Sequence, residues 1–226
     1  MSERIAIVVG AGGELGRATA AALAGTGYTV VGVDRSEDGL RKLPDGIGQE
    51  VSDGSDPAAA KAVIDRIAAQ AGPPEVLVNT IGMFRLGEAI AATHDDLRVL
   101  MDVNLGAALW LSQAVEPYMR QQGKGSIVHV SARPATDPTA GMAAYSLSKA
   151  ALSHLVRILD LELRPHGIRV NGVAPQLINT TVNQSLFPAD VLAHAVQPEA
   201  VANVIAFLAG DLAAPVSGAI VPAYGA

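Results

Sequence analysis

Val8-Val9-Gly10-Ala11-Gly12-Gly13-Glu14-Leu15-Gly16 is the stretch that decides the fold of this 226-residue chain. A short β-branched run, residues 5–9, precedes the glycines, and an Ala/Leu-rich run, residues 15–24, follows them. A glycine-rich turn between a predicted strand and a predicted helix leaves backbone N–H groups bare at the helix N-terminus, where the phosphates of a dinucleotide bind. The stretch therefore predicts a β-α-β unit that binds a dinucleotide.

The same alternation continues along the whole chain. Short β-branched runs predict strands at residues 5–9, 29–33, 76–78, 127–130 and 168–173. Ala/Leu-rich runs predict helices at residues 15–24, 57–70, 94–122, 142–164 and 198–208. Strands that are apolar on both faces and alternate with helices are typical of a parallel sheet, and no linker-like segment divides the sequence. We expect residues 1–226 to form a single doubly wound α/β Rossmann domain, with a mainly parallel sheet of about seven strands flanked by helices.

Composition excludes several classes of protein. Half of the residues are hydrophobic and 17% are charged, so the chain can bury one substantial core. The net charge of −6 and the scattered basic residues argue against a nucleic-acid surface. The apolar run at residues 5–9 is too short for a signal peptide or a membrane span. The absence of cysteine excludes disulfides and suits a reducing compartment, so we expect a cytoplasmic protein that contacts neither nucleic acid nor membrane.

No metal site is expected. The histidines show no metal-ligand spacing with carboxylates, so we expect them at the surface or at helix ends. They are His94, His129, His154, His166 and His194.

Asp34 ends the second predicted strand, about twenty residues after the glycine turn, where an acid binds the ribose hydroxyls of a dinucleotide. A carboxylate at this position repels a 2′-phosphate, which favours NAD over NADP. Arg35 could instead pair with such a phosphate, but the turn offers Gly13 and Glu14 rather than a basic residue. The electrostatics therefore favour NAD, with NADP as the alternative.

Tyr145-Ser146-Leu147-Ser148-Lys149 places a phenol and an ammonium on one face of a predicted helix. A nearby cation favours the phenolate, so we expect Lys149 to lower the pKa of Tyr145 toward the range of a general acid. This spacing also occurs by chance in helices, so it carries weight only together with the glycine turn and Asp34.

Together these residues resemble the short-chain dehydrogenase/reductase family, and the likeness covers nearly the whole chain. It implies that Tyr145 and Lys149 are the catalytic pair and that Asn104 positions a water in the proton relay. It also implies a small-molecule substrate, a homodimer or homotetramer, and a last strand within residues 217–225. The cofactor-binding residues that it implies are Gly10, Gly12, Gly13, Glu14, Leu15, Gly16, Asp34, Arg35, Glu50, Val51, Asn79, Thr80, Gly82, Tyr145, Lys149, Pro175, Ile178 and Thr180.

The chain departs from the family's pattern at the substrate pocket. Ala132 stands where the family has a catalytic serine, so we consider Ser131 and Gln176 as replacement donors and Arg133 as a substrate contact. Ser131 needs a bulge or twist to reach the pocket, because successive side chains of a strand point to opposite faces. Arg133 could equally be a solvated loop residue. The Ala132-Arg133 pair also resembles dihydropteridine reductases of this family. Their quinonoid substrates react at a conjugated imine, so a serine hydroxyl directed at a carbonyl is less necessary.

The sequence therefore predicts an NAD(H)-dependent oxidoreductase that transfers a hydride between nicotinamide and a small carbonyl or alcohol, with Tyr145 as acid and base. Two alternatives stay open. One is reduction of a quinonoid imine. The other is a non-catalytic NAD(H)-binding redox sensor, which is suggested by Ala132 and Gln176 because both depart from the family's pattern.

Overall fold

The computed structural model describes residues 3–225, which form one seven-stranded parallel sheet in the order β3-β2-β1-β4-β5-β6-β7. The strands are β1 (Ile5–Val9), β2 (Thr29–Asp34), β3 (Gly48–Val51), β4 (Pro74–Asn79), β5 (Gly125–Val130), β6 (Ile168–Pro175) and β7 (Ile220–Ala223). From β1 the chain adds strands outward to one side as far as β3 and then crosses to the other side of β1 to form β4, so the direction of strand addition reverses between β1 and β4. In open α/β sheets, ligands bind at the carboxyl edge beside such a reversal.

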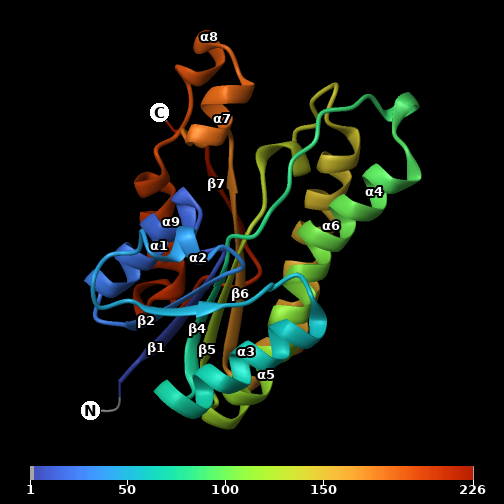
Figure 1. Cartoon of the computed structure of the whole chain (residues 1–226). Coiled ribbons are helices and arrows are strands. Elements are labelled where there is room, and N and C mark those ends of the chain that lie inside the picture. The colour runs from blue at the N-terminus through green and yellow to red at the C-terminus, as the bar shows by residue number, and fades with distance from the viewer. Residues whose placement is uncertain (1–2, 226) are drawn as a thin grey trace.

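Helices cover both faces of the sheet, as predicted (Figure 1). They are α1 (Glu14–Gly25), α2 (Glu37–Leu40), α3 (Pro57–Ala71), α4 (His94–Met101), α5 (Ala107–Gln122), α6 (Ala143–Leu163), α7 (Thr181–Leu186), α8 (Ala189–Leu192) and α9 (Pro198–Ala209). Apolar side chains of α1 and α9 form one core against the sheet, and those of α3, α5 and α6 form the other. The short helices α7 and α8 lie beyond the carboxyl ends of the strands (Figure 1). None of the helices in residues 3–225 is long and apolar enough to cross a membrane.

The predicted helix at residues 94–122 is wrong in one respect. The chain forms α4, then a π-helical turn at Asp102–Gly106, and then α5. A π-helical turn inserts one extra residue into the helix and turns the side chains that follow, and such turns are frequent at functional sites. Asn104 lies in this turn and is fully buried.

The sequence patterns missed β3 and the three short helices α2, α7 and α8. The β3 strand, Gly-Gln-Glu-Val, is exposed at the edge of the sheet, so it has none of the continuous apolar character that marks the inner strands. The last strand, β7, lies where the family resemblance placed it. The helix predicted at residues 57–70 is confirmed as α3, and the Asp56 carboxylate caps its start by accepting a hydrogen bond from Ala59 N at 2.7 Å.

Candidate active site

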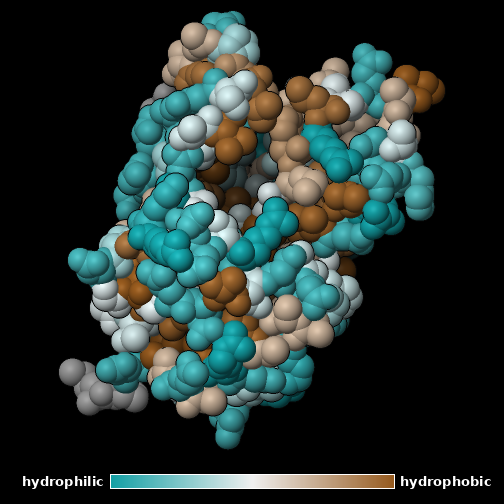
Figure 2. Space-filling model, viewed as in Figure 1, coloured by the Kyte–Doolittle hydropathy of each residue, from teal (hydrophilic) through white to brown (hydrophobic). Residues whose placement is uncertain are grey.

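A cavity of about 930 Å³ opens at the carboxyl ends of β1, β4, β5 and β6. Figure 2 shows the hollow between the part of the chain that carries α7 and α8 and the part that carries α4 and α6, with hydrophobic side chains around it. The predicted site residues that line it are Gly10, Gly12, Gly13, Glu14, Leu15, Gly16, Thr80, Gly82, Ser131, Ala132, Arg133, Tyr145, Lys149, Pro175, Gln176, Ile178 and Thr180.

The glycine turn forms a cradle of bare backbone at one end of the cavity. Gly10 has a φ of 85°, which favours glycine, and a Cβ there would lie 2.5 Å from Thr80 Oγ1. At Gly16, the first turn of α1 packs directly on the turn, so that a Cβ would lie 2.7 Å from Ala11 Cα. The first turn of a helix following bare backbone is the arrangement that holds a pyrophosphate, so these residues fit the dinucleotide.

Asp34 ends β2 beside this cradle. Its carboxylate accepts hydrogen bonds from Gly12 N at 2.9 Å and Ser36 N at 2.8 Å, which fix it at the edge of the glycine turn. The neighbouring Arg35 is exposed and does not line the cavity. Two other predicted cofactor residues do not line the cavity: the Glu50 carboxylate pairs with Arg66 at 2.9 Å, and Val51 is 54% exposed.

Asn79 and Asn104 support the site from behind. Asn79 is buried, and its Oδ1 accepts from Ile81 N at 2.9 Å, which shapes the turn after β4. Asn104 Oδ1 accepts from Met83 N at 2.8 Å. Its Nδ2 donates to Met83 O and to Ser148 Oγ, both at 2.9 Å. Both amide donors of Asn104 are therefore used in holding the cavity wall to α6.

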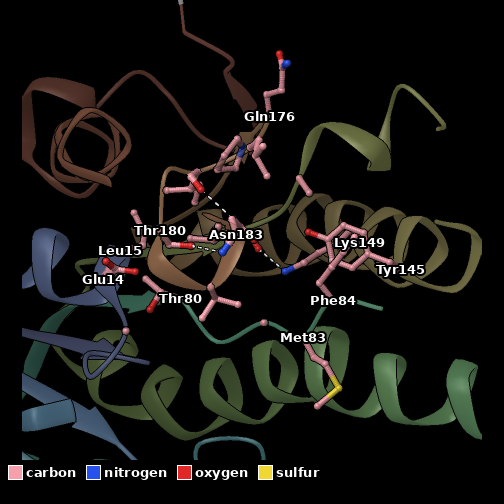
Figure 3. A pocket seen from close by; sticks show the side chains of 18 of the residues that line it. Glu14, Leu15, Thr80, Met83, Phe84, Tyr145, Lys149, Gln176, Thr180 and Asn183 are labelled. Carbon is pink, nitrogen blue, oxygen red and sulfur yellow. Dashed lines mark hydrogen bonds between the residues drawn. The ribbon is translucent and has the colours of Figure 1, made fainter. Parts of the chain in front are cut away.

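Tyr145 and Lys149 extend from α6 into the cavity (Figure 3). Burial raises the pKa of the Tyr145 phenol to about 12 and lowers the pKa of the Lys149 ammonium to about 8. The pKa of Tyr145 is therefore raised, opposite in direction to the shift expected from Lys149. Lys149 Nζ donates to Val130 O at 2.8 Å, and desolvation of the phenol dominates.

The substrate end of the cavity is largely apolar. Phe84 contacts the Tyr145 ring edge-to-face, with ring centroids 4.9 Å apart. The ring centroid of Phe187 lies 5.9 Å from that of Phe84. The lining residues that the sequence patterns missed are Arg17, Lys42, Met83, Phe84, Val130, Pro134, Asp137, Pro138, Thr139, Met142, Leu177, Thr181, Val182, Asn183, Phe187 and Val191. Most of them follow the ends of β4, β5 and β6, and this position along the chain is the signal that could have found them.

One histidine lies elsewhere than predicted. His129, in β5, is fully buried, and its Nε2 lies 3.1 Å from Ser112 Oγ. Burial lowers its pKa to about 3, so the ring is neutral at physiological pH. Within residues 3–225, no cluster of three or more His, Cys, Asp or Glu side chains could hold a metal ion.

Known proteins are similar to this chain in sequence and in fold. Residues 4–191 match the family model described as short chain dehydrogenase. The chain belongs to the short-chain dehydrogenase family. The 3-oxoacyl-[acyl-carrier-protein] reductase FabG of Escherichia coli (strain K12) is 32% identical, over 95% of this chain and 93% of that protein. Galactitol 2-dehydrogenase of Rhizobium johnstonii is 35% identical, over 96% of this chain and 91% of that protein.

The fold of the chain agrees with this membership. The solved structure of Thermoplasma acidophilum aldohexose dehydrogenase superposes with a TM-score of 0.88 at 26% identity, covering 97% of this chain and 92% of that one. Short-chain dehydrogenases are oxidoreductases that use nicotinamide cofactors. The cavity that holds the glycine cradle and the Tyr145–Lys149 pair thus belongs to a short-chain dehydrogenase domain.

Neither of the replacement donors expected for this short-chain dehydrogenase points toward Tyr145. Ser131 is buried, and its Oγ bonds Ser153 Oγ at 2.6 Å and Lys149 O at 3.3 Å. Gln176 extends away from Tyr145 and Lys149 (Figure 3), and its Oε1 accepts from Arg133 Nη1 at 2.9 Å. Ala132 itself is buried at the cavity wall. The hydroxyl of the family's serine therefore has no substitute in Ser131 or Gln176.

Arg133 is occupied by protein groups at the mouth of the cavity. Besides Gln176, its guanidinium pairs with Asp137 at 3.1 Å and stacks over the Tyr224 ring at 5.0 Å. The Arg133 side chain is nonetheless 42% exposed, so the residue lies at the solvent-facing mouth of the cavity.

Proposed function

We propose that this protein is an NAD(H)-dependent oxidoreductase that transfers a hydride between nicotinamide and a small carbonyl or alcohol, with Tyr145 as general acid and base. The single observation that carries the proposal is that the Tyr145 phenol and the Lys149 ammonium line the same cavity as the glycine cradle. The relatives act on different molecules, as their names state, so they support the reaction type rather than one substrate.

Each residue has a distinct task in this reaction. A bound nicotinamide supplies or accepts the hydride. In reduction, the Tyr145 hydroxyl donates its proton to the carbonyl oxygen, and in oxidation the phenolate takes the proton of the alcohol. Lys149, whose pKa is about 8, is mainly protonated at neutral pH and stabilises the phenolate that forms. Asn104 holds the cavity wall against α6, which keeps Tyr145 and Lys149 in place.

The direct test of this proposal is turnover. Purified protein is mixed with NADH and a panel of small aldehydes, ketones and quinonoid compounds, and in the other direction with NAD and alcohols, while absorbance of the reduced nicotinamide is followed. We expect turnover with at least one carbonyl or alcohol. Tight NADH binding without turnover on any compound would instead support the non-catalytic alternative.

We expect NADH to bind at least ~10-fold more tightly than NADPH, because the Asp34 carboxylate stands beside the cradle and repels a 2′-phosphate. Asp34→Ala should narrow this gap, mainly by tightening NADPH. Fluorescence titration with both cofactors measures the effect, and Asp45→Ala, which removes an exposed carboxylate from the loop after α2, is the matched control. Equal affinities in the unaltered protein would refute the NAD assignment.

Ala132→Ser should accelerate carbonyl reduction, by up to the ~10²-fold that a single added donor to the developing oxyanion can contribute. Ser131→Ala should change kcat only a few-fold, because its hydroxyl serves α6 rather than the cavity. Steady-state kinetics on the best carbonyl substrate measure both variants. If Ala132→Ser has no effect on carbonyl reduction while a quinonoid imine is reduced readily, the substrate is a quinonoid imine rather than a carbonyl.

We also propose that the protein is a homodimer or homotetramer. Leu147 and Leu161 on α6 are 59% and 71% exposed in the single chain, and leucines at this exposure on one helix support an interface with another copy.

A further inference from the structure

Glu14, the first residue of α1, contacts a segment far along the chain. Its carboxylate accepts hydrogen bonds from Thr181 N at 2.8 Å and from Thr181 Oγ1 at 3.1 Å. The two residues are 167 positions apart in sequence, and Thr181 is the first residue of α7. One carboxylate thus joins the glycine turn to the segment that carries α7 and α8.

This contact lies across the cavity. Glu14 and Thr181 both line it, and in Figure 3 the Glu14 side chain lies on the side of the cavity opposite Tyr145 and Lys149. A dinucleotide that reaches from Asp34 to Lys149 has to pass the Glu14–Thr181 contact. The pyrophosphate is the part of the cofactor that lies over the first turn of α1, which is where Glu14 begins the helix.

The charge of Glu14 opposes that ligand. A pyrophosphate carries two negative charges, and like charges a few ångströms apart repel each other, the more so where the bound ligand itself displaces water. The bonding partners of the Glu14 carboxylate are the uncharged groups of Thr181, and within residues 3–225 no ion pair neutralises it. The nearest cationic residue along α1, Arg17, donates instead to Gly12 O at 2.5 Å.

We propose that Glu14 is an affinity-determining residue of the cofactor site. Its hydrogen bonds to Thr181, here called the Glu14–Thr181 clasp, have to break before the pyrophosphate can bind. This inference rests on the proposed function, because it assumes that a dinucleotide occupies the cavity. While the carboxylate bonds Thr181, it holds α7 against the glycine turn. When a pyrophosphate enters, the carboxylate leaves Thr181, and the cost of this step weakens binding and slows entry.

Binding of cofactor fragments tests the clasp without turnover. Glu14→Gln keeps an acceptor for Thr181 but removes the charge, and Glu14→Asp keeps the charge on a shorter side chain. We expect Glu14→Gln to tighten NADH and ADP-ribose by ~10-fold, with the gain shrinking at high salt because the repulsion is screened. Adenosine, which has no phosphate, should bind both proteins equally. Glu14→Asp should stay within a few-fold of the unaltered protein.

The kinetics of entry test the second half of the inference. Thr181→Val removes the hydroxyl donor and leaves the charge of Glu14, so stopped-flow fluorescence should show faster NADH association with a smaller change in affinity. Calorimetry gives the fragment affinities, and circular dichroism checks that each variant is folded.

Three outcomes would overturn the clasp. The first is that ADP-ribose binds Glu14→Gln no more tightly than it binds the unaltered protein. The second is that adenosine tightens as much as ADP-ribose, since the effect would then not come from the phosphates. The third is that neither protein binds ADP-ribose or NADH, which would refute the proposed function and the clasp together. Binding without tightening refutes the clasp alone.

Discussion

Tyr145→Phe is expected to lower kcat by ~10²–10⁴-fold, the usual contribution of a positioned general acid. Phenylalanine keeps the ring that contacts Phe84 and loses only the hydroxyl, so binding of NADH should stay within a few-fold. Stopped-flow turnover and fluorescence titration measure the two quantities separately. Tyr118→Phe is the matched control, because the Tyr118 hydroxyl bonds Asp65 and neither residue lines the cavity.

The pH dependence of this step follows from burial. The pKa of Tyr145 is about 12, so the phenol is protonated and competent as an acid at neutral pH. The pKa of Lys149 is lowered to about 8, so the cation that stabilises the forming phenolate is present below that pH and is lost above it. We expect carbonyl reduction to be level near neutral pH and to fall as the pH rises through about 8. An unchanged kcat in Tyr145→Phe would refute the assignment of Tyr145.

Gly16→Ala is expected to cost about 3 kcal/mol or more of folding stability, because a Cβ at this position meets backbone rather than a movable side chain. For a chain of this size the loss corresponds to a fall of ~6–12 °C in Tm. The same displacement should open the glycine turn and abolish ADP-ribose binding. Differential scanning calorimetry and isothermal titration measure the two effects.

Gly25→Ala is the matched control for this substitution. Gly25 ends the same helix, and a Cβ there meets nothing within 4 Å, so Tm should change little. A Gly16→Ala protein as stable as Gly25→Ala would show that α1 can move off the turn. The close packing of α1 on Gly10 would then not be required for the fold.

Local patterns were enough to predict most of the architecture. Strands buried on both faces produce continuous β-branched runs, so β1, β2, β4, β5 and β6 were found, whereas the exposed edge strand β3 was not. The glycine turn, Asp34 and the Tyr145–Lys149 pair were also found, because each depends on a spacing within one strand, turn or helix. The π-helical turn at Asp102–Gly106 left no such spacing to read.

The amino-acid sequence by itself determined the order of strands and helices and the identity of the groups at the carboxyl edge of the sheet. Only the tertiary structure decided where those groups point and how they ionise. Ser131 turns to Ser153, Gln176 is held by Arg133, and Glu14 reaches Thr181 through contacts between segments distant in the chain. The high pKa of Tyr145 likewise comes from desolvation by the surrounding fold, a cause that the spacing of Tyr145 and Lys149 in the sequence does not show.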